Sequence, residues 1–309
     1  MNPWLMGLLA AAVSAVAGAT SWLEPDEPSP AEGALLDDGP VLGEDPPIGS
    51  ELLWRDRSPP LSLTVLHPLA SVDDQTIARL VSTDLESLGS MSVGSPSRGA
   101  LVNGIRFPES PLWRLADPEH AWGTRESVDF VRHAIERVNE QFDDTPVVYV
   151  GDFSSQHGGR LKPHKSHQSG RDADIGYYYT NGSAWYRRAD ASNLDRARTW
   201  ALVEALITET RVQYIFIDRR LQPLLEEYAL AEGEDPQWLR RVFHGTPGRK
   251  DSIIRHRWGH ATHLHVRFEN PTAEITAQRA YPSLKLAKVL PGYDYYPQPR
   301  STRWRRKRR

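Results

Sequence analysis

The chain has 309 residues, of which 39% are hydrophobic, so it can bury a substantial core in one large domain or two ordinary ones. Its formal net charge of −3 gives no general reason to expect a polyanionic partner. It contains no cysteine, which excludes disulfides and thiolate metal ligands. Any metal site must therefore be built from histidines and carboxylates.

The start of the chain has the features of an export signal. An apolar run from Trp4 to Ala17 is followed by Ala17-Gly18-Ala19, which fits the small-residue rule for a cleavage site. The run is short for a membrane span, and no Lys or Arg precedes it. We expect residues 1–19 to be a signal peptide or an uncleaved anchor, and the protein to be exported.

Charge differs strongly between the two ends. Residues 20–50 are rich in Pro, Gly and acids, a composition that predicts a disordered linker. Seven of the last ten residues, 300–309, are basic. A solvated tail is the simplest interpretation of this run, and an anionic envelope polymer or lipid is the partner that export would offer it. Nucleic acid is not the expected partner of an exported protein.

The first half of the chain contains two weak patterns and one strong one. Residues 51–96 form an N-terminal extension to which the sequence assigns no role, although the alternation at 61–66 predicts a strand and residues 73–88 a helix. Thr124 can cap the helix that follows it. The apolar positions of that helix share one face: Val128, Val131, Ile135, Val138 and Phe142.

Further elements alternate along the rest of the chain. Strands are predicted at 146–151, 173–178, 214–217 and 263–268, and helices at 193–210 and 235–242. The long polar connections favour an α+β domain, a small antiparallel sheet flanked by helices, over a doubly wound sheet. After Asn270 the composition predicts a Pro-, Tyr- and Arg-rich tail, residues 271–309, that wraps the surface or hangs free.

Five of the eleven histidines fall in two short clusters. The first is His164-Lys-Ser-His167, which Asp174 follows closely. Gly170 lies between His167 and Asp174, where it would let the backbone turn so that both side chains meet at one ion. The second cluster, His260-Ala-Thr-His263-Leu-His265, ends on a predicted strand. Positions i and i+2 of a strand share a face, so one imidazole could bind metal while its neighbour reaches a bound water.

Together the clusters predict a catalytic zinc site. Three protein ligands and one open position are typical of catalytic zinc, which lowers the pKa of water to about 7 and polarises a carbonyl, as amide hydrolysis requires. His-x-His alone is weak evidence, but its combination with the first cluster is stronger. Asp172 is a competing carboxylate that we expect to face away from Asp174 and to be solvated. The other histidines are interpreted as ordinary surface or core residues: His67, His120, His133, His157, His244 and His256.

Three motifs resemble those of the penicillin-insensitive murein endopeptidases. They are Gly158-Gly159-Arg160, the segment from His164 to Ile175, and the segment from Trp258 to Arg267. That family is part of a larger group of zinc peptidases that includes lysostaphin-type enzymes, D-Ala-D-Ala metallopeptidases and the hedgehog signalling domain. The likeness covers roughly residues 97–270, which we expect to form a single zinc-peptidase domain.

The resemblance implies roles for individual residues. His167, Asp174 and His265 would bind Zn²⁺, and His263 and His260 would act on the water and the transition state. His164 would lie beside the metal or contact the substrate. The family cleaves the D-alanyl to meso-diaminopimelyl cross-link between peptidoglycan stem peptides, which implies a periplasmic or cell-envelope location.

Other considerations come from the residues themselves. His263 is the better candidate for proton transfer, because it shares a strand face with His265, and His260 would orient the water or stabilise the oxyanion. Arg267 comes two residues after the second histidine cluster and could hold a carboxylate of the peptide. A D-Ala-D-Ala carboxypeptidase or dipeptidase could use the same site. A non-catalytic zinc- or peptidoglycan-binding envelope protein is the alternative outside enzymology.

Overall fold

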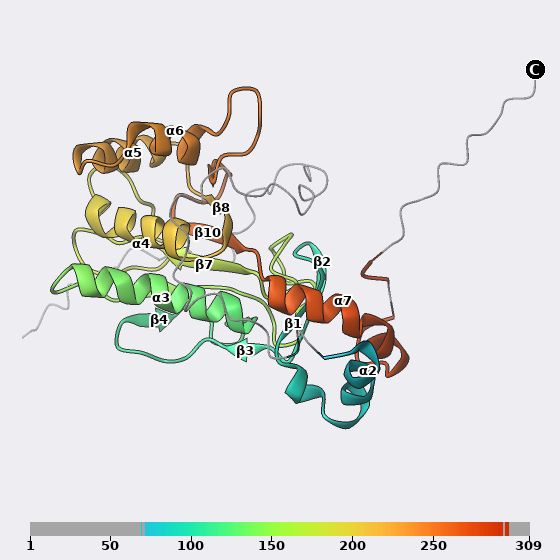
Figure 1. The fold of residues 1–309 in the computed structure, drawn as a ribbon. Helices are drawn as coiled ribbons and strands as arrows, with labels where there is room; N and C mark the ends of the chain where they lie inside the picture. The colour runs from blue at the N-terminus through green and yellow to red at the C-terminus, as the bar shows by residue number, and fades with distance from the viewer. Residues whose placement is uncertain (1–68, 70–71, 293, 297–309) are drawn as a thin grey trace, which may run out of the picture.

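The computed structural model describes residues 69, 72–292 and 294–296. The predicted leader, the linker, the strand at 61–66, His67 and the basic end all lie outside these described residues. Within the described part, no helix combines the length and the apolarity needed to cross a membrane. The elements of the described chain form a mixed α+β structure (Figure 1), as the sequence predicted.

A six-stranded sheet forms the centre of the molecule. Its inner strands pair antiparallel, whereas each edge strand is parallel to its neighbour. From edge to edge the strands are β4 (Trp113–Leu115), β6 (Val148–Val150), β7 (Asp172–Gly176), β10 (His263–Phe268), β8 (Val212–Phe216) and β9 (Ile254–Arg255). The predicted strand at 263–268 is confirmed at both ends.

Two long helices, α3 (Arg125–Gln141) and α4 (Arg196–Glu209), lie side by side along the sheet (Figure 1). Thr124 caps α3 as predicted, because its side chain accepts a hydrogen bond from the Ser127 N–H. The buried face of α3 packs on the sheet, where the Phe130 and Phe268 rings lie 5.4 Å apart. The chain between β8 and β9 adds α5 (Gln222–Ala231), which the sequence did not predict, and α6 (Pro236–His244).

A second hydrophobic cluster is built from both ends of the described chain. Its N-terminal elements are α2 (Asp74–Thr83), the 3-10 helix η2 (Leu85–Leu88), β1 (Met91–Ser95) and β2 (Arg98–Val102). A further small ladder pairs β3 (Ile105–Arg106) with β5 (Trp122–Gly123). The C-terminal element is α7 (Pro271–Leu286), which packs against β1 and α2 (Figure 1).

The helix α7 corrects one prediction. Residues 271–286 were expected to belong to a tail, but they form a helix whose inner face is buried. Pro282 lies inside this helix, and the Pro- and Tyr-containing composition concealed the helical pattern. Asn270, fully buried before α7, donates hydrogen bonds to the Thr124 and Ser127 hydroxyls at the start of α3. The start of α7 is therefore tied to the core of the domain.

Replacing a buried residue of α7 should show that this helix is part of the folded unit. Leu284 is 0% exposed, so Leu284→Ala should lower the free energy of unfolding by about 2–5 kcal/mol. Leu286 lies on the same helix and is 86% exposed, so Leu286→Ala should change it by less than about 0.5 kcal/mol. Urea unfolding of both variants measures the difference, and equal stability would contradict the packing of α7.

Candidate metal centre

The register between β7 and β10 creates the site. The two strands are antiparallel, with His265 opposite Asp174, Arg267 opposite Asp172 and His263 opposite Gly176. Residues two apart on a strand share a face, so these polar side chains occupy one face of the sheet. The alternate residues, such as Leu264 and Val266, belong to the hydrophobic core.

His167 reaches the same face from the loop between β6 and β7. Its backbone adopts the left-handed conformation, with φ 62°, and its N–H donates to Asp172 Oδ2 at 2.8 Å. Its Nδ1 donates to the Phe153 carbonyl at 2.9 Å. Because a carbonyl only accepts, Nδ1 carries the proton and Nε2 keeps its lone pair for a ligand.

Three donor atoms converge into a small triangle. His167 Nε2 lies 3.1 Å from His265 Nδ1 and 3.4 Å from Asp174 Oδ1, and the last two atoms are 3.0 Å apart. Ligand atoms about 2.0–2.1 Å from a tetrahedral zinc lie about 3.3 Å from one another. The donor set that the family resemblance implied therefore has the size of a metal site, and it could hold a metal ion.

The electrostatics of the triangle favour a cation. Burial alone would raise the pKa of Asp174, but the neighbouring His167 and His263 hold that pKa well below its usual range. Burial alone would lower the pKa of His167, yet Asp174 beside it raises this pKa. Since the Asp174 carboxylate favours positive charge on His167, it would also favour a positive metal ion at this position.

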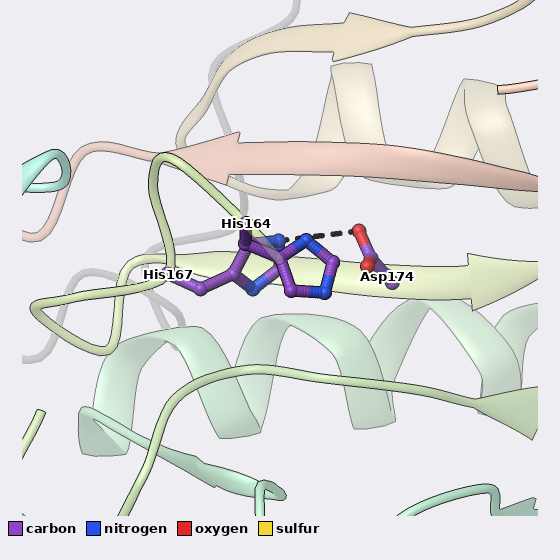
Figure 2. A group of neighbouring side chains, drawn as sticks. All are labelled: His164, His167 and Asp174. Atoms are coloured by element: carbon purple, nitrogen blue, oxygen red, sulfur yellow. Dashed lines mark ion pairs between the residues drawn. The ribbon is translucent and has the colours of Figure 1, made fainter. Parts of the chain in front are cut away.

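Figure 2 shows His164 beside His167 and Asp174, which are two of the three residues of this triangle. One ligand atom from each of these three residues lies within 4.8 Å of the others, so they too could hold a metal ion. The His164 and His167 rings are 4.4 Å apart, and His164 Nε2 lies 2.9 Å from Asp152 Oδ2. The Asp152 carboxylate thus holds one nitrogen of His164 and leaves the other available.

The remaining histidines of the second cluster, His260 and His263, also face the centre. The His260 ring lies 5.1 Å from the His263 ring and 5.7 Å from the His265 ring. His260 Nδ1 lies 3.0 Å from the Trp258 carbonyl, to which it donates, so Nε2 keeps its lone pair. Burial lowers the pKa of His263 and, with the charge of neighbouring histidines, holds the pKa of His260 well below its usual value. Both imidazoles are therefore neutral proton acceptors at neutral pH.

Asp172 and Arg267 differ from their predictions. Asp172 faces the same side as Asp174, because residues two apart on a strand share a face, and it is 0% exposed rather than solvated. The Arg267 guanidinium makes a two-point ion pair with it, at 2.6 and 3.0 Å. His265 Nε2 lies 3.4 Å from Asp172 Oδ1. Arg267 is thus committed to a buried carboxylate beneath the ligands and is not presented to a substrate.

The structure adds residues that the sequence analysis did not select. Asp152 lies two residues after the end of β6, and the position of a carboxylate near a strand end was the available signal. Trp185 and Tyr186 lie in the connection between β7 and α4, with their rings 6.0 and 5.5 Å from the His263 ring. Burial raises the pKa of Tyr186 to about 12, so its hydroxyl remains a hydrogen-bond donor. No spacing pattern links these aromatic residues to the histidines.

Some histidines interpreted as ordinary have carboxylate partners. His120 lies with Asp117 and Asp152 in a second group whose ligand atoms are within 4.8 Å of one another, and all three are partly exposed. His133 pairs with Glu209, which joins α3 to α4. These pairs lie outside the triangle of ligand atoms.

Removing Arg267 should destabilise the protein before it affects substrate binding. Arg267→Ala leaves the Asp172 carboxylate buried without its cation, which should cost about 3–5 kcal/mol of unfolding free energy. Arg132→Ala, which removes partly exposed ion pairs on α3, should cost less than about 1 kcal/mol. Denaturant unfolding compares the two. A fully stable Arg267→Ala protein with a raised KM would instead support a role in substrate binding.

Comparison with known protein families matches residues 92–285 to the penicillin-insensitive murein endopeptidases. A search of curated proteins found no match. The matched segment covers more than half of the chain and includes both histidine clusters, Asp174, the central sheet and nearly all of α7. It therefore begins in β1 and extends beyond residue 270, where the sequence analysis had expected the domain to end. The chain belongs to the penicillin-insensitive murein endopeptidase family.

Proposed function

We propose that this protein is a zinc-dependent endopeptidase that hydrolyses D-alanyl to meso-diaminopimelyl cross-links in peptidoglycan. Membership of a murein endopeptidase family makes peptidoglycan the substrate and peptide hydrolysis the reaction. The observation that carries the proposal is the buried triangle of His167 Nε2, His265 Nδ1 and Asp174 Oδ1. Its size and its donor chemistry are those of a three-ligand zinc site.

In this proposal His167, Asp174 and His265 hold the zinc. Two imidazoles and one carboxylate, without sulfur, are a donor set found in catalytic rather than structural zinc sites. When bound, zinc supplies a Lewis acid for the scissile carbonyl and lowers the pKa of water. The chain orients the ligands through the Phe153 carbonyl on His167 and Asp172 on His265.

In this proposal His263 transfers a proton, and His260 orients the water or stabilises negative charge. His263 Nε2 lies 3.7 Å from Asp174 Oδ2, at the edge of the ligand triangle, and His263 Nδ1 faces the Thr262 hydroxyl. This position supports a role for Nε2 in accepting a proton from water and returning it to the leaving amine. His260, neutral and held through Nδ1, orients the water or stabilises the developing oxyanion.

In this proposal His164 contacts the substrate at the edge of the centre. Asp152 orients its ring at the edge of the triangle, where it can hydrogen-bond the substrate. The rings of Trp185 and Tyr186 pack beside His263 and restrict the approach of water from that direction.

The proposed substrate favours a location in the cell envelope. Peptidoglycan lies outside the cytoplasmic membrane, so we propose an exported protein, periplasmic or attached to the envelope, whose partners are the stem peptides. The apolar start of the sequence supports this location. An anionic envelope polymer or lipid remains the proposed partner of the basic end.

Chelation should abolish the activity. Incubated with cross-linked peptidoglycan dimers, the protein should convert them to monomers, and a chelator or His265→Ala should stop this conversion because either removes the metal. His244→Ala should retain activity, since His244 is exposed and pairs only with Glu226 among the described residues. Mass spectrometry of the products measures how much dimer has been converted to monomer. Loss of terminal D-Ala with dimers intact would indicate a carboxypeptidase, and zinc binding without cleavage would indicate a binding protein.

His263→Ala should separate proton transfer from metal binding. Because His263 is proposed to move a proton rather than to hold zinc, kcat should fall about 10²–10⁴-fold while one zinc per chain is retained. His265→Ala should lose both the metal and the activity. Steady-state kinetics combined with metal analysis of the two purified variants makes the comparison. Loss of zinc from His263→Ala would assign this residue to the ligand set instead.

A further inference from the structure

A surface of arginine and tryptophan adjoins the metal centre. It consists of Arg219, after β8, and Arg257 and Trp258, after β9, and we call it the Arg/Trp surface. Trp258 is 57% exposed, although a large aromatic side chain is normally well buried. The Trp258 ring is also in contact with a charged group, because the Arg219 guanidinium lies over it.

Both guanidinium groups are stacked on aromatic rings. The Arg219 guanidinium carbon lies 5.1 Å from the centre of the Trp258 ring, and that of Arg257 lies 5.9 Å from the centre of the Phe216 ring. Stacking holds a guanidinium in place while its edge N–H groups remain available to a ligand. Across the described residues, neither Arg219 nor Arg257 forms an ion pair with a carboxylate. Their positive charge is therefore not neutralised within the described chain.

The segments that carry this surface are fixed to each other. The Arg219 N–H donates to His256 Nδ1 at 3.1 Å, and the Asp218 N–H donates to the His260 carbonyl at 3.2 Å. The Ile217 N–H donates to the Arg255 carbonyl at 2.9 Å. These hydrogen bonds connect the chain after β8 to the chain after β9, so the arginines have defined positions.

The surface is continuous with the catalytic histidines. The Trp258 carbonyl accepts the hydrogen bond that orients His260. The Phe216 ring, on which Arg257 stacks, lies 5.5 Å from both the His260 and the His265 rings. A peptide whose scissile bond lies at the triangle would therefore have its flanking residues over the Arg/Trp surface.

We propose that Arg219, Arg257 and Trp258 form a subsite that binds a carboxylate of an acidic peptide beside the scissile bond. This rests on the proposed peptidase function and extends it to substrate selection. Guanidinium groups bind carboxylates through paired charge-assisted hydrogen bonds, and the face of Trp258 covers the apolar part of the bound residue. Arg267, the arginine expected from the sequence to do this, is buried on Asp172 and cannot.

The test compares two substrates and two kinds of variant. The substrates are a soluble cross-linked stem-peptide dimer with free carboxylates and the same dimer with its carboxylates amidated. For the free dimer, Arg219→Gln/Arg257→Gln should raise KM about tenfold or more and leave kcat within about twofold, because the lost interactions bind substrate without touching the reacting atoms. The control Arg132→Gln, on α3, should match the wild type.

Amidation should reproduce the effect of the double variant. The wild type should show a raised KM for the amidated dimer, and the double variant should no longer distinguish the two dimers. An unchanged KM in the double variant would overturn the subsite, as would a loss confined to kcat. If the double variant raised KM equally for both dimers, the proposal would also be overturned, because the arginines would then not recognise a carboxylate.

Calorimetry separates failure of this subsite from failure of the proposed function. The free dimer is titrated into chelator-treated wild type and double variant, neither of which can hydrolyse it by the proposed mechanism. Binding weakened about tenfold or more in the double variant supports the subsite even if the wild type proves to have no peptidase activity. Equal binding, or no binding to the wild type, overturns it.

Discussion

The antiparallel register of β7 and β10 is the constraint on which the rest of the site depends. It places His265 opposite Asp174 and Arg267 opposite Asp172, so that two proposed ligands and the ion pair beside them form neighbouring cross-strand pairs on one face. A shift of one residue would turn these side chains into the hydrophobic core and bring Leu264 and Val266 to the surface of the site. Core packing against α3 and the geometry of the candidate metal centre thus depend on the same hydrogen-bond ladder.

Asp172 joins this ladder to the loop that supplies His167. Its carboxylate accepts the His167 N–H, makes the ion pair with Arg267 and faces His265 Nε2. Burial alone would raise the pKa of Asp172, but Arg267 and His265 hold it well below its usual range, so the group stays charged. One buried charge therefore orients two of the three proposed ligands, and Arg267 is what allows this charge to be buried.

The two faces of the central sheet and the loops at its ends have different roles. Helices α3 and α4 lie along the sheet (Figure 1) and share a hydrophobic core with Leu264 and Val266 of β10, whereas the alternate residues His263 and His265 face the opposite side. The loops that follow the strands supply the groups around the candidate metal centre. These groups are Asp152, which contacts His164, the rings of Trp185 and Tyr186, and the arginines around Trp258. In the proposed enzyme the sheet carries residues that bind the metal, and these loops determine which substrates can bind beside it.

The sequence by itself determined the local features of this protein. The alternation of His263 and His265 with apolar residues fixed a strand with two faces, Thr124 fixed the start of α3, and the absence of cysteine limited a metal site to imidazole and carboxylate. Only the tertiary structure decided which charges pair with one another and which helix faces pack together. Asp172 and Arg267 are 95 residues apart, and α7 finds its partners in β1 and α2 near the other end of the described chain. Local periodicity carries no information about such distant partners, because the burial of a charge or of a helix face depends on what packs against it in space.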